Sequence, residues 1–234
     1  MNDVNRASVH GVPGEHARAT GVMRAIWPLL AAILLCGILL GSALPRVALG
    51  VSGAGFLVAA CFLLWAVRDG FRGIDSFFKG ARGEESVAAL LAALPRGFHV
   101  FHDLMCGSAG GIDHVVVGPS GVFVVETKCW AGAVTVEDGA ILADGEVPSR
   151  PPIAQARASS RALSLFLQDK LESVPACVPV VCFASNTFKR ELQMCDDTVI
   201  CNATALPTLI VAGAGHLSSD EIERIVKVME PKDS

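Results

Sequence analysis

Residues 111–128 read Gly-Ile-Asp-His-Val-Val-Val-Gly-Pro-Ser-Gly-Val-Phe-Val-Val-Glu-Thr-Lys. Two valine-rich apolar runs flank Pro119-Ser120, and short runs of this kind bounded by Gly and Pro are typical of buried β-strands. If Pro119-Ser120 is a two-residue loop, Gly118 pairs with Gly121 and the two runs form an antiparallel hairpin. The stretch therefore predicts two neighbouring strands inside a sheet.

This register places Asp113 directly opposite Glu126, with Cβ atoms about 5 Å apart. Two carboxylates at that distance repel each other, and strands lined by valines solvate neither of them well. A divalent cation would remove both costs. Lys128 projects from the same face as Glu126 because side chains on a strand alternate with a period of two. Asp113, Glu126 and Lys128 therefore predict a metal site.

Two alternatives to this metal site stay open from the residues alone. The three side chains could form an ordinary ion-pair cluster at a solvated strand end. A three-residue loop would also shift the register by one and turn the two acids onto opposite faces of the sheet.

The sequence around the hairpin predicts a mixed domain over residues 80–234. A helix is expected over 83–94, where apolar residues recur at helical spacing, and a strand over 98–104. Ser218 and Glu221 form a capping-box pattern that predicts a terminal helix over 219–229. Further elements are expected as strands at 133–136, 140–142, 178–184 and 198–201, a helix from 151 to about 170, and an apolar run of ambiguous type at 206–212. This order predicts an α/β or α+β domain.

The first third of the chain is strongly apolar. Two stretches of about 20 residues, 25–44 and 47–67, match the length of membrane-crossing helices, with a turn near Arg46 between them. Basic residues flank their outer ends, which predicts that both termini face the cytoplasm. We therefore expect a transmembrane hairpin over 23–68 in the inner membrane, with the lipid bilayer as a partner. A cleaved signal peptide or two buried core helices are the alternatives.

Charge and cysteine content limit the function of the rest of the chain. Residues 1–79 carry 7 Lys and Arg against 4 Asp and Glu, whereas residues 80–234 carry 12 against 19. An acidic domain is not typical of a strong nonspecific nucleic-acid binder. The eight cysteines lack zinc-ligand spacing and are expected to be reduced thiols. A disordered cytoplasmic tail is expected over 1–22 and a linker over 69–79.

Several stretches resemble the NERD, or nuclease-related domain, family. They are Gly80-Ala-Arg-Gly-Glu84, the run from Gly111 through Lys128 to Gly132, and Pro152 with Gln155. The resemblance implies a restriction-endonuclease-like α-β-β-β-α-β core over about residues 80–170. It also implies that Asp113 and Glu126 hold Mg²⁺, or Mn²⁺ in its place, that Lys128 assists the attacking water, and that Glu84 and Gln155 border the site.

Together these features predict a membrane-anchored, metal-dependent nuclease that hydrolyses phosphodiesters, with DNA preferred to RNA as its substrate. We expect Lys128, Glu126, Asp113 and Gln155 as catalytic residues and Asp113, Glu126 and Glu84 as metal ligands. Arg150, Arg157 and Arg161 are the nearest candidates for phosphate contacts, but a solvated helix face is the favoured interpretation of these three residues. The alternatives are an inactive binding module that keeps the nuclease-like fold and a membrane assembly factor that acts through its hairpin.

Overall fold

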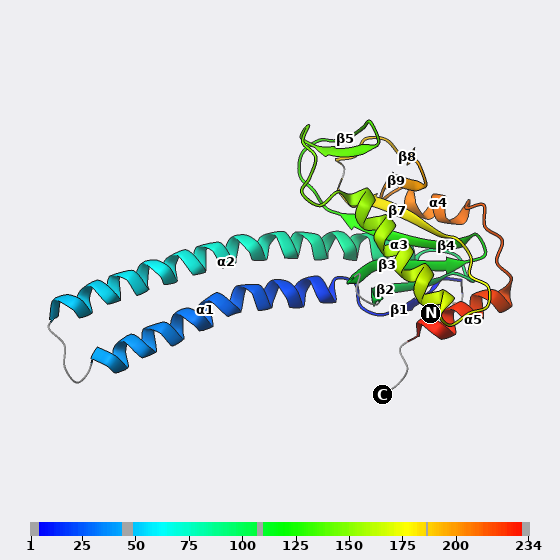
Figure 1. The fold of residues 1–234 in the computed structure, drawn as a ribbon. Helices are drawn as coiled ribbons and strands as arrows, with labels where there is room; N and C mark the ends of the chain where they lie inside the picture. Colours follow the sequence, from blue (N-terminus) through cyan, green and yellow to red (C-terminus); the bar gives the residue numbers. More distant parts are fainter. Residues whose placement is uncertain (1–4, 44–48, 107–109, 186, 231–234) are drawn as a thin grey trace. The chain divides into compact units, whose positions relative to one another are not determined.

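The chain divides into two units in a computed structural model that describes residues 5–43, 49–106, 110–185 and 187–230 (Figure 1). Unit 1 comprises residues 1–15 and 80–234, and unit 2 comprises residues 16–79. Unit 2 consists of most of helix α1 (Glu15–Ala43) and the first part of helix α2 (Leu49–Ala92). The expected turn at residues 44–47 and the first four residues of the tail lie outside the described residues.

Unit 1 is built on a seven-stranded mixed sheet with the order β1-β2-β3-β4-β7-β9-β8. The β1–β2, β4–β7 and β7–β9 pairs are parallel, and the remaining three pairs are antiparallel. A separate hairpin, β5–β6, follows β4. The elements are β1 (Ser8–His10), β2 (His99–Met105), β3 (Gly111–Gly118), β4 (Gly121–Lys128), β5 (Val134–Glu137), β6 (Ala140–Ala143), α3 (Pro152–Gln168), β7 (Cys177–Phe183), β8 (Leu192–Cys195), β9 (Thr198–Asn202), α4 (Leu206–Val211) and α5 (Ser219–Met229).

The expected α/β class is confirmed, and α2, β2, β3, β4, α3 and β7 follow one another in the order α-β-β-β-α-β, with the β5–β6 hairpin inserted before α3. The β3–β4 hairpin has the predicted register, because Gly118 pairs with Gly121 and His114 with Val125. Its two-residue loop, Pro119-Ser120, is tied to α4, because Ser120 Oγ donates to the carbonyl of Ile210 at 2.5 Å. The loop geometry therefore fixes which side chains of β3 and β4 lie opposite one another.

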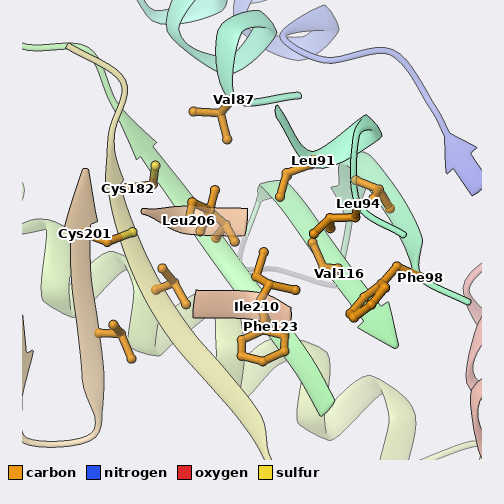
Figure 2. Packing of buried hydrophobic residues seen from close by; sticks show 14 residues of the cluster. Val87, Leu91, Leu94, Phe98, Val116, Phe123, Cys182, Cys201, Leu206 and Ile210 are labelled. Atoms are coloured by element: carbon orange, nitrogen blue, oxygen red, sulfur yellow. The ribbon is translucent and has the colours of Figure 1, made fainter. Parts of the chain in front are cut away.

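Both faces of the sheet are covered by helices. One face carries a cluster in which the end of α2 and helix α4 pack on β3, β4, β7 and β9 (Figure 2). On the other face, Leu163 and Leu167 of α3 and Ile225 of α5 pack against the valines of β3 and β4. Strands covered on both faces are apolar throughout, which explains the near-continuous valine runs.

The structure corrects the membrane assignment. Within the described residues, no helix is long and apolar enough to cross a bilayer. The two helices are not confined to the apolar stretches, because α1 already begins at Glu15 and α2 runs on through the charged segment at 68–79. The expected inner-membrane location is therefore contradicted, and the transmembrane hairpin expected at 23–68 is not supported within the described residues.

Three other elements differ from expectation. Residues 8–10 of the expected disordered tail form β1, which pairs with β2 and so gains a hydrogen-bonded partner that local sequence does not reveal. Residues 69–79, expected as a linker, continue α2 without a break. Strand β8 (Leu192–Cys195) had no expected counterpart, and the ambiguous run at 206–212 is helix α4.

A histidine pair is buried between β2 and β3. The Nδ1 atoms of His102 and His114 lie 2.8 Å apart, so one ring donates and the other accepts. Burial, and then the neighbouring His102, lowers the pKa of His114 to about 3. Burial, and then His10, lowers the pKa of His102 to about 4. Both rings are therefore neutral at pH 7: protonating the accepting ring at Nδ1 removes the acceptor, and protonating either ring buries a positive charge.

This pair is expected to make the fold sensitive to acid. Because both pKa values lie below the ordinary value of 6.5, the stabilisation is complete above pH 6.5 and is lost as pH falls toward 4. Between pH 7 and pH 5 we expect a loss on the order of 4 kcal/mol, about 2 kcal/mol for each histidine, relative to a His102→Phe/His114→Leu variant. Urea unfolding of both proteins at the two pH values measures it.

Comparing the wild type with this variant separates the effect of the two histidines on stability from the effect of the acids in the same unit. The pKa of Glu84 is raised to about 7 and that of Asp113 is also raised, so these carboxyls act in the opposite direction over the same range. Equal pH dependence in wild type and variant would show that the buried pair does not control acid stability.

Candidate functional site

Asp113, Glu126 and Lys128 lie at adjoining ends of β3 and β4. The backbone N–H of Thr127 donates to Asp113 Oδ2 at 2.7 Å, and Lys128 Nζ donates to Glu126 Oε1 at 2.5 Å. The predicted register, continued one pair beyond His114 and Val125, sets Asp113 opposite Glu126. The ion pair is largely enclosed, since the side chains of Lys128 and Glu126 are 16% and 12% exposed. The hairpin thus brings the three predicted residues together.

Glu84 joins this group from α2. Gly83, directly before it, lies against the segment that follows β4, and a Cβ atom there would come within 2.7 Å of Cys129 Cβ. The glycine therefore allows the helix to approach closely enough for Glu84 to reach the carboxylates. Burial, then Asp103, then Glu126 raise the pKa of Glu84 to about 7, and Lys128 opposes the rise.

The carboxyl of Asp113 is held in an unfavourable environment for its charged form. Burial raises its pKa well above the ordinary value, and the charges of Glu126 and Glu84 raise it further. The Thr127 N–H bond and Lys128 only partly offset these effects. Clustered acids with raised pKa values beside a cation are typical of functional sites, because such an arrangement stabilises the fold poorly.

Asp103 is a fourth acid that the sequence did not indicate. The β2–β3 register pairs His102 with His114 and Leu104 with Ile112, so Asp103 occupies the position opposite Asp113. Its φ of 52° is left-handed, which interrupts the ladder at that residue. The charge of Asp103 also raises the pKa of Glu84. Extending the strand register from β3 to β2 would have been the only sequence signal for it.

Gln155 lies in the first turns of α3. By strand alternation, Glu126 and Lys128 share the face of β4 that carries Val122 and Val124, which is the face that α3 covers. The Oε1 atom of Gln155 is buried and makes no hydrogen bond within the part of the chain that the structure describes. Gln155 is therefore on the expected side of the sheet and has an acceptor available. Among the described residues, however, no interaction joins it to Glu84, Asp113, Glu126 or Lys128.

The donor set suits a hard divalent cation such as Mg²⁺ or Mn²⁺, which prefers carboxylate oxygens. Burial, and then the neighbouring acids, raise the pKa values of Glu84 and Asp113, and a cation bound between them would favour their charged forms. In the conformation described, however, no three His, Cys, Asp or Glu side chains among the described residues are gathered closely enough to hold a metal. The residues fit a metal in chemistry and charge, and their side chains must turn to coordinate one.

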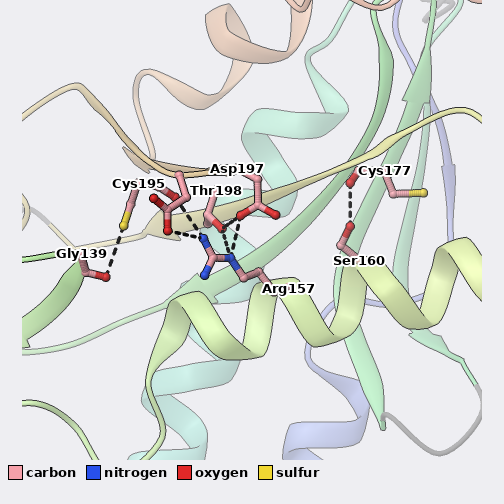
Figure 3. Close-up of polar contacts among 8 residues, drawn as sticks. Gly139, Arg157, Ser160, Cys177, Cys195, Asp197 and Thr198 are labelled. Atoms are coloured by element: carbon pink, nitrogen blue, oxygen red, sulfur yellow. Dashed lines mark hydrogen bonds and ion pairs between the residues drawn. The ribbon is translucent and has the colours of Figure 1, made fainter.

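Arg157 donates to residues at the start of β9 and in the turn before it, including Asp197 and Thr198, as Figure 3 shows. Its Nε donates to Asp197 Oδ1 at 2.6 Å and its Nη2 to Asp196 Oδ2 at 3.1 Å, both in the turn between β8 and β9. These acids hold the guanidinium against that turn. Arg157 thus ties α3 to the β8–β9 hairpin, a role that differs both from the phosphate contact for which it was a candidate and from the favoured solvated helix face.

Comparison with known proteins places these residues in one family region. Residues 79–184 match the NERD, nuclease-related domain, family. The NERD region begins within α2 and ends one residue after β7, so it contains Glu84, Asp103, Asp113, Glu126, Lys128 and Gln155. The sequence resemblance is confirmed for this range, and it supports a nuclease-related function.

Other similarities are limited in extent. An uncharacterised protein of Bacillus anthracis is 40% identical over 60 residues, which is 24% of this chain and 28% of that protein. The chain thus spans less than a third of that relative's length. No solved structure matches the chain significantly.

Proposed function

We propose that the NERD region is a metal-dependent nuclease that hydrolyses nucleic-acid phosphodiesters, with DNA preferred to RNA, on a restriction-endonuclease-like core. The observation that carries the proposal is the group of mutually repelling carboxylates next to Lys128, at the ends of two strands whose register fixes their positions. Asp113, Glu126 and Glu84 are the metal ligands. Lys128 and Gln155 complete the site.

A bound Mg²⁺ or Mn²⁺ would lower the pKa of a water molecule and neutralise charge that develops on the phosphate. Lys128 supplies a second positive charge. Its ammonium has three donors, so it can keep its bond to Glu126 while donating to a phosphate oxygen or to the attacking water. The free Oε1 acceptor of Gln155 would accept a hydrogen bond from that water and orient it. The enclosure of the Lys128–Glu126 pair strengthens these interactions, because fewer water dipoles screen them.

An inactive nucleic-acid or protein binding module is the second candidate. Two observations favour it: the acidic charge of residues 80–234, and the direct pairing of Lys128 with Glu126 in place of a gathered set of three ligands. Such a module has no need of tight Mg²⁺ binding, and metal titration therefore separates the two candidates.

Cleavage assays with the purified full chain test the proposed activity. Labelled single-stranded, double-stranded and branched DNA, and RNA, are incubated with Mg²⁺ or Mn²⁺, and EDTA is added to matched samples. We expect DNA fragments that accumulate only with metal. Intact substrates in every combination would contradict the nuclease proposal and favour the binding module.

Metal affinity is expected to rise with pH across neutrality. Glu84, with a pKa of about 7, must lose its proton before it can coordinate a cation, so protons compete with metal below that pH. We expect Mn²⁺ to bind roughly tenfold more tightly at pH 8 than at pH 6, as measured by isothermal titration calorimetry. In a Glu84→Gln variant the dependence should flatten. The same affinity at both pH values in wild type would remove Glu84 from the ligand set.

A further inference from the structure

The carboxyl ends of β4 and β7 continue into two segments that run together beyond the candidate site. The N–H of Ala184 donates to the carbonyl of Lys128 at 2.9 Å, and Ser185 Oγ donates to the carbonyl of Trp130 at 2.7 Å. Further along, Val134 N–H donates to the carbonyl of Thr187 at 3.3 Å. The two segments are thus hydrogen-bonded to each other from Lys128 onward. The first of them continues directly from β4, the strand that carries Glu126 and Lys128.

A groove of about 600 Å³ opens between these segments, with β5 on one side and residues 187–190 on the other. A single isolated bridge, Val134 to Phe188, joins the two sides. Phe188 is buried in the core beside Phe183 and so fixes the floor of the groove to the sheet. In open α/β sheets, ligands bind beyond the carboxyl ends of the strands, which is where this groove lies.

The walls of the groove offer hydrogen-bond donors. Lys189 and Arg190 are exposed on one wall. One N–H of Arg190 donates to Gln193 Oε1 at 3.1 Å, and its guanidinium has four further N–H groups. On the other wall, the backbone N–H groups of β5 point alternately toward β6 and away from it. Val134 directs its N–H away from β6, and Val136, two residues on, directs its N–H the same way. Glu137 is the one acid among the residues that line the described groove.

We propose that this groove binds the sugar–phosphate backbone of the nucleic-acid strand next to the bond that is cut, with Lys189 and Arg190 contacting its phosphates. The inference rests on the proposed function, and it names where the substrate lies. Two cations and an outward backbone N–H match phosphate oxygens, which are acceptors only. It also explains how an acidic domain can bind nucleic acid, since the few cations needed are gathered along one path.

Binding of a fluorescein-labelled single-stranded DNA to the full chain tests the groove. The Lys128→Ala chain in EDTA serves as background, so that cleavage does not consume the probe, and anisotropy is measured over a range of NaCl concentrations. We expect Lys189→Ala/Arg190→Ala to weaken binding roughly tenfold or more at low salt and to reduce the salt slope by about 1.4, which is about 0.7 for each of the two charges on a single strand. Glu137→Gln should tighten binding.

The matched control is Arg224→Ala/Lys227→Ala on α5, which removes the same charge from exposed residues away from the groove. It should leave the affinity unchanged. Equal affinities for the two double variants, or no DNA binding by the background chain, would overturn the inference; an extended peptide as the natural occupant predicts such equality. DNA binding that depends on Lys189 and Arg190 without any cleavage by wild type would instead contradict only the proposed catalysis.

Discussion

Lys128→Ala is expected to lower the rate of phosphodiester cleavage by roughly 100-fold or more, because it removes a fixed positive charge from an enclosed site where charge develops during the reaction. Cleavage of labelled DNA by the full chain under single-turnover conditions measures the loss. Binding of the DNA should change much less, since the groove cations remain. Wild-type activity in the variant would exclude Lys128 from the chemistry.

The control must separate lost chemistry from lost folding. Lys128 and Glu126 are both largely enclosed, so removing the lysine leaves an unpaired carboxylate that destabilises the folded state. A Lys128→Ala/Glu126→Gln double variant removes that charge as well and should recover the thermal unfolding temperature without recovering activity. Lys170→Ala breaks an exposed ion pair with Asp169 at 3.2 Å and should leave the rate unchanged.

Gly118→Ala is expected to destabilise the fold by about 1–3 kcal/mol, because the added methyl group overfills a packed core. Its Cβ atom would lie 2.2 Å from Cδ1 of the Phe98 ring, which is itself buried. Relief requires the ring or the hairpin end to move, and the hairpin end sets the register of Asp113 and Glu126. Urea unfolding measures the cost.

Gly80→Ala is the matched control, because a Cβ atom at Gly80 meets nothing within 4 Å and the residue lies in α2. Alanine favours helix over glycine, so this change should be neutral or slightly stabilising. If both substitutions were equally tolerated, the close contact between Gly118 and Phe98 would not constrain the hairpin.

The hairpin could be predicted from the sequence because its determinants are local. A two-residue loop between valine runs fixes the pairing of Gly118 with Gly121, and every later pair follows by counting. The same holds for α5, whose capping box of Ser218 and Glu221 is present in the structure. Local turn and cap chemistry does not depend on distant parts of the chain.

Other features depended on distant residues and could not be predicted. Arg157 pairs with Asp196 and Asp197, about 40 positions away, and no local pattern distinguishes such an arginine from one exposed for phosphate. Asp103 required the register of a second strand pair and a left-handed residue within it. The long apolar stretches were interpreted from their length and flanking charge, and neither shows where a helix begins or ends.

Strand β1 has a consequence for how unit 1 holds together. The chain leaves this unit after Glu15 and re-enters it at Gly80, and the two crossing points adjoin, since a Cβ atom on Gly14 would lie 3.0 Å from that of Ala81. A protease cut anywhere within residues 16–79 would therefore yield two fragments that stay associated through the β1–β2 ladder. For the same reason, a short linker in place of 16–79 joins neighbouring points and preserves a strand that a truncation at residue 80 would discard.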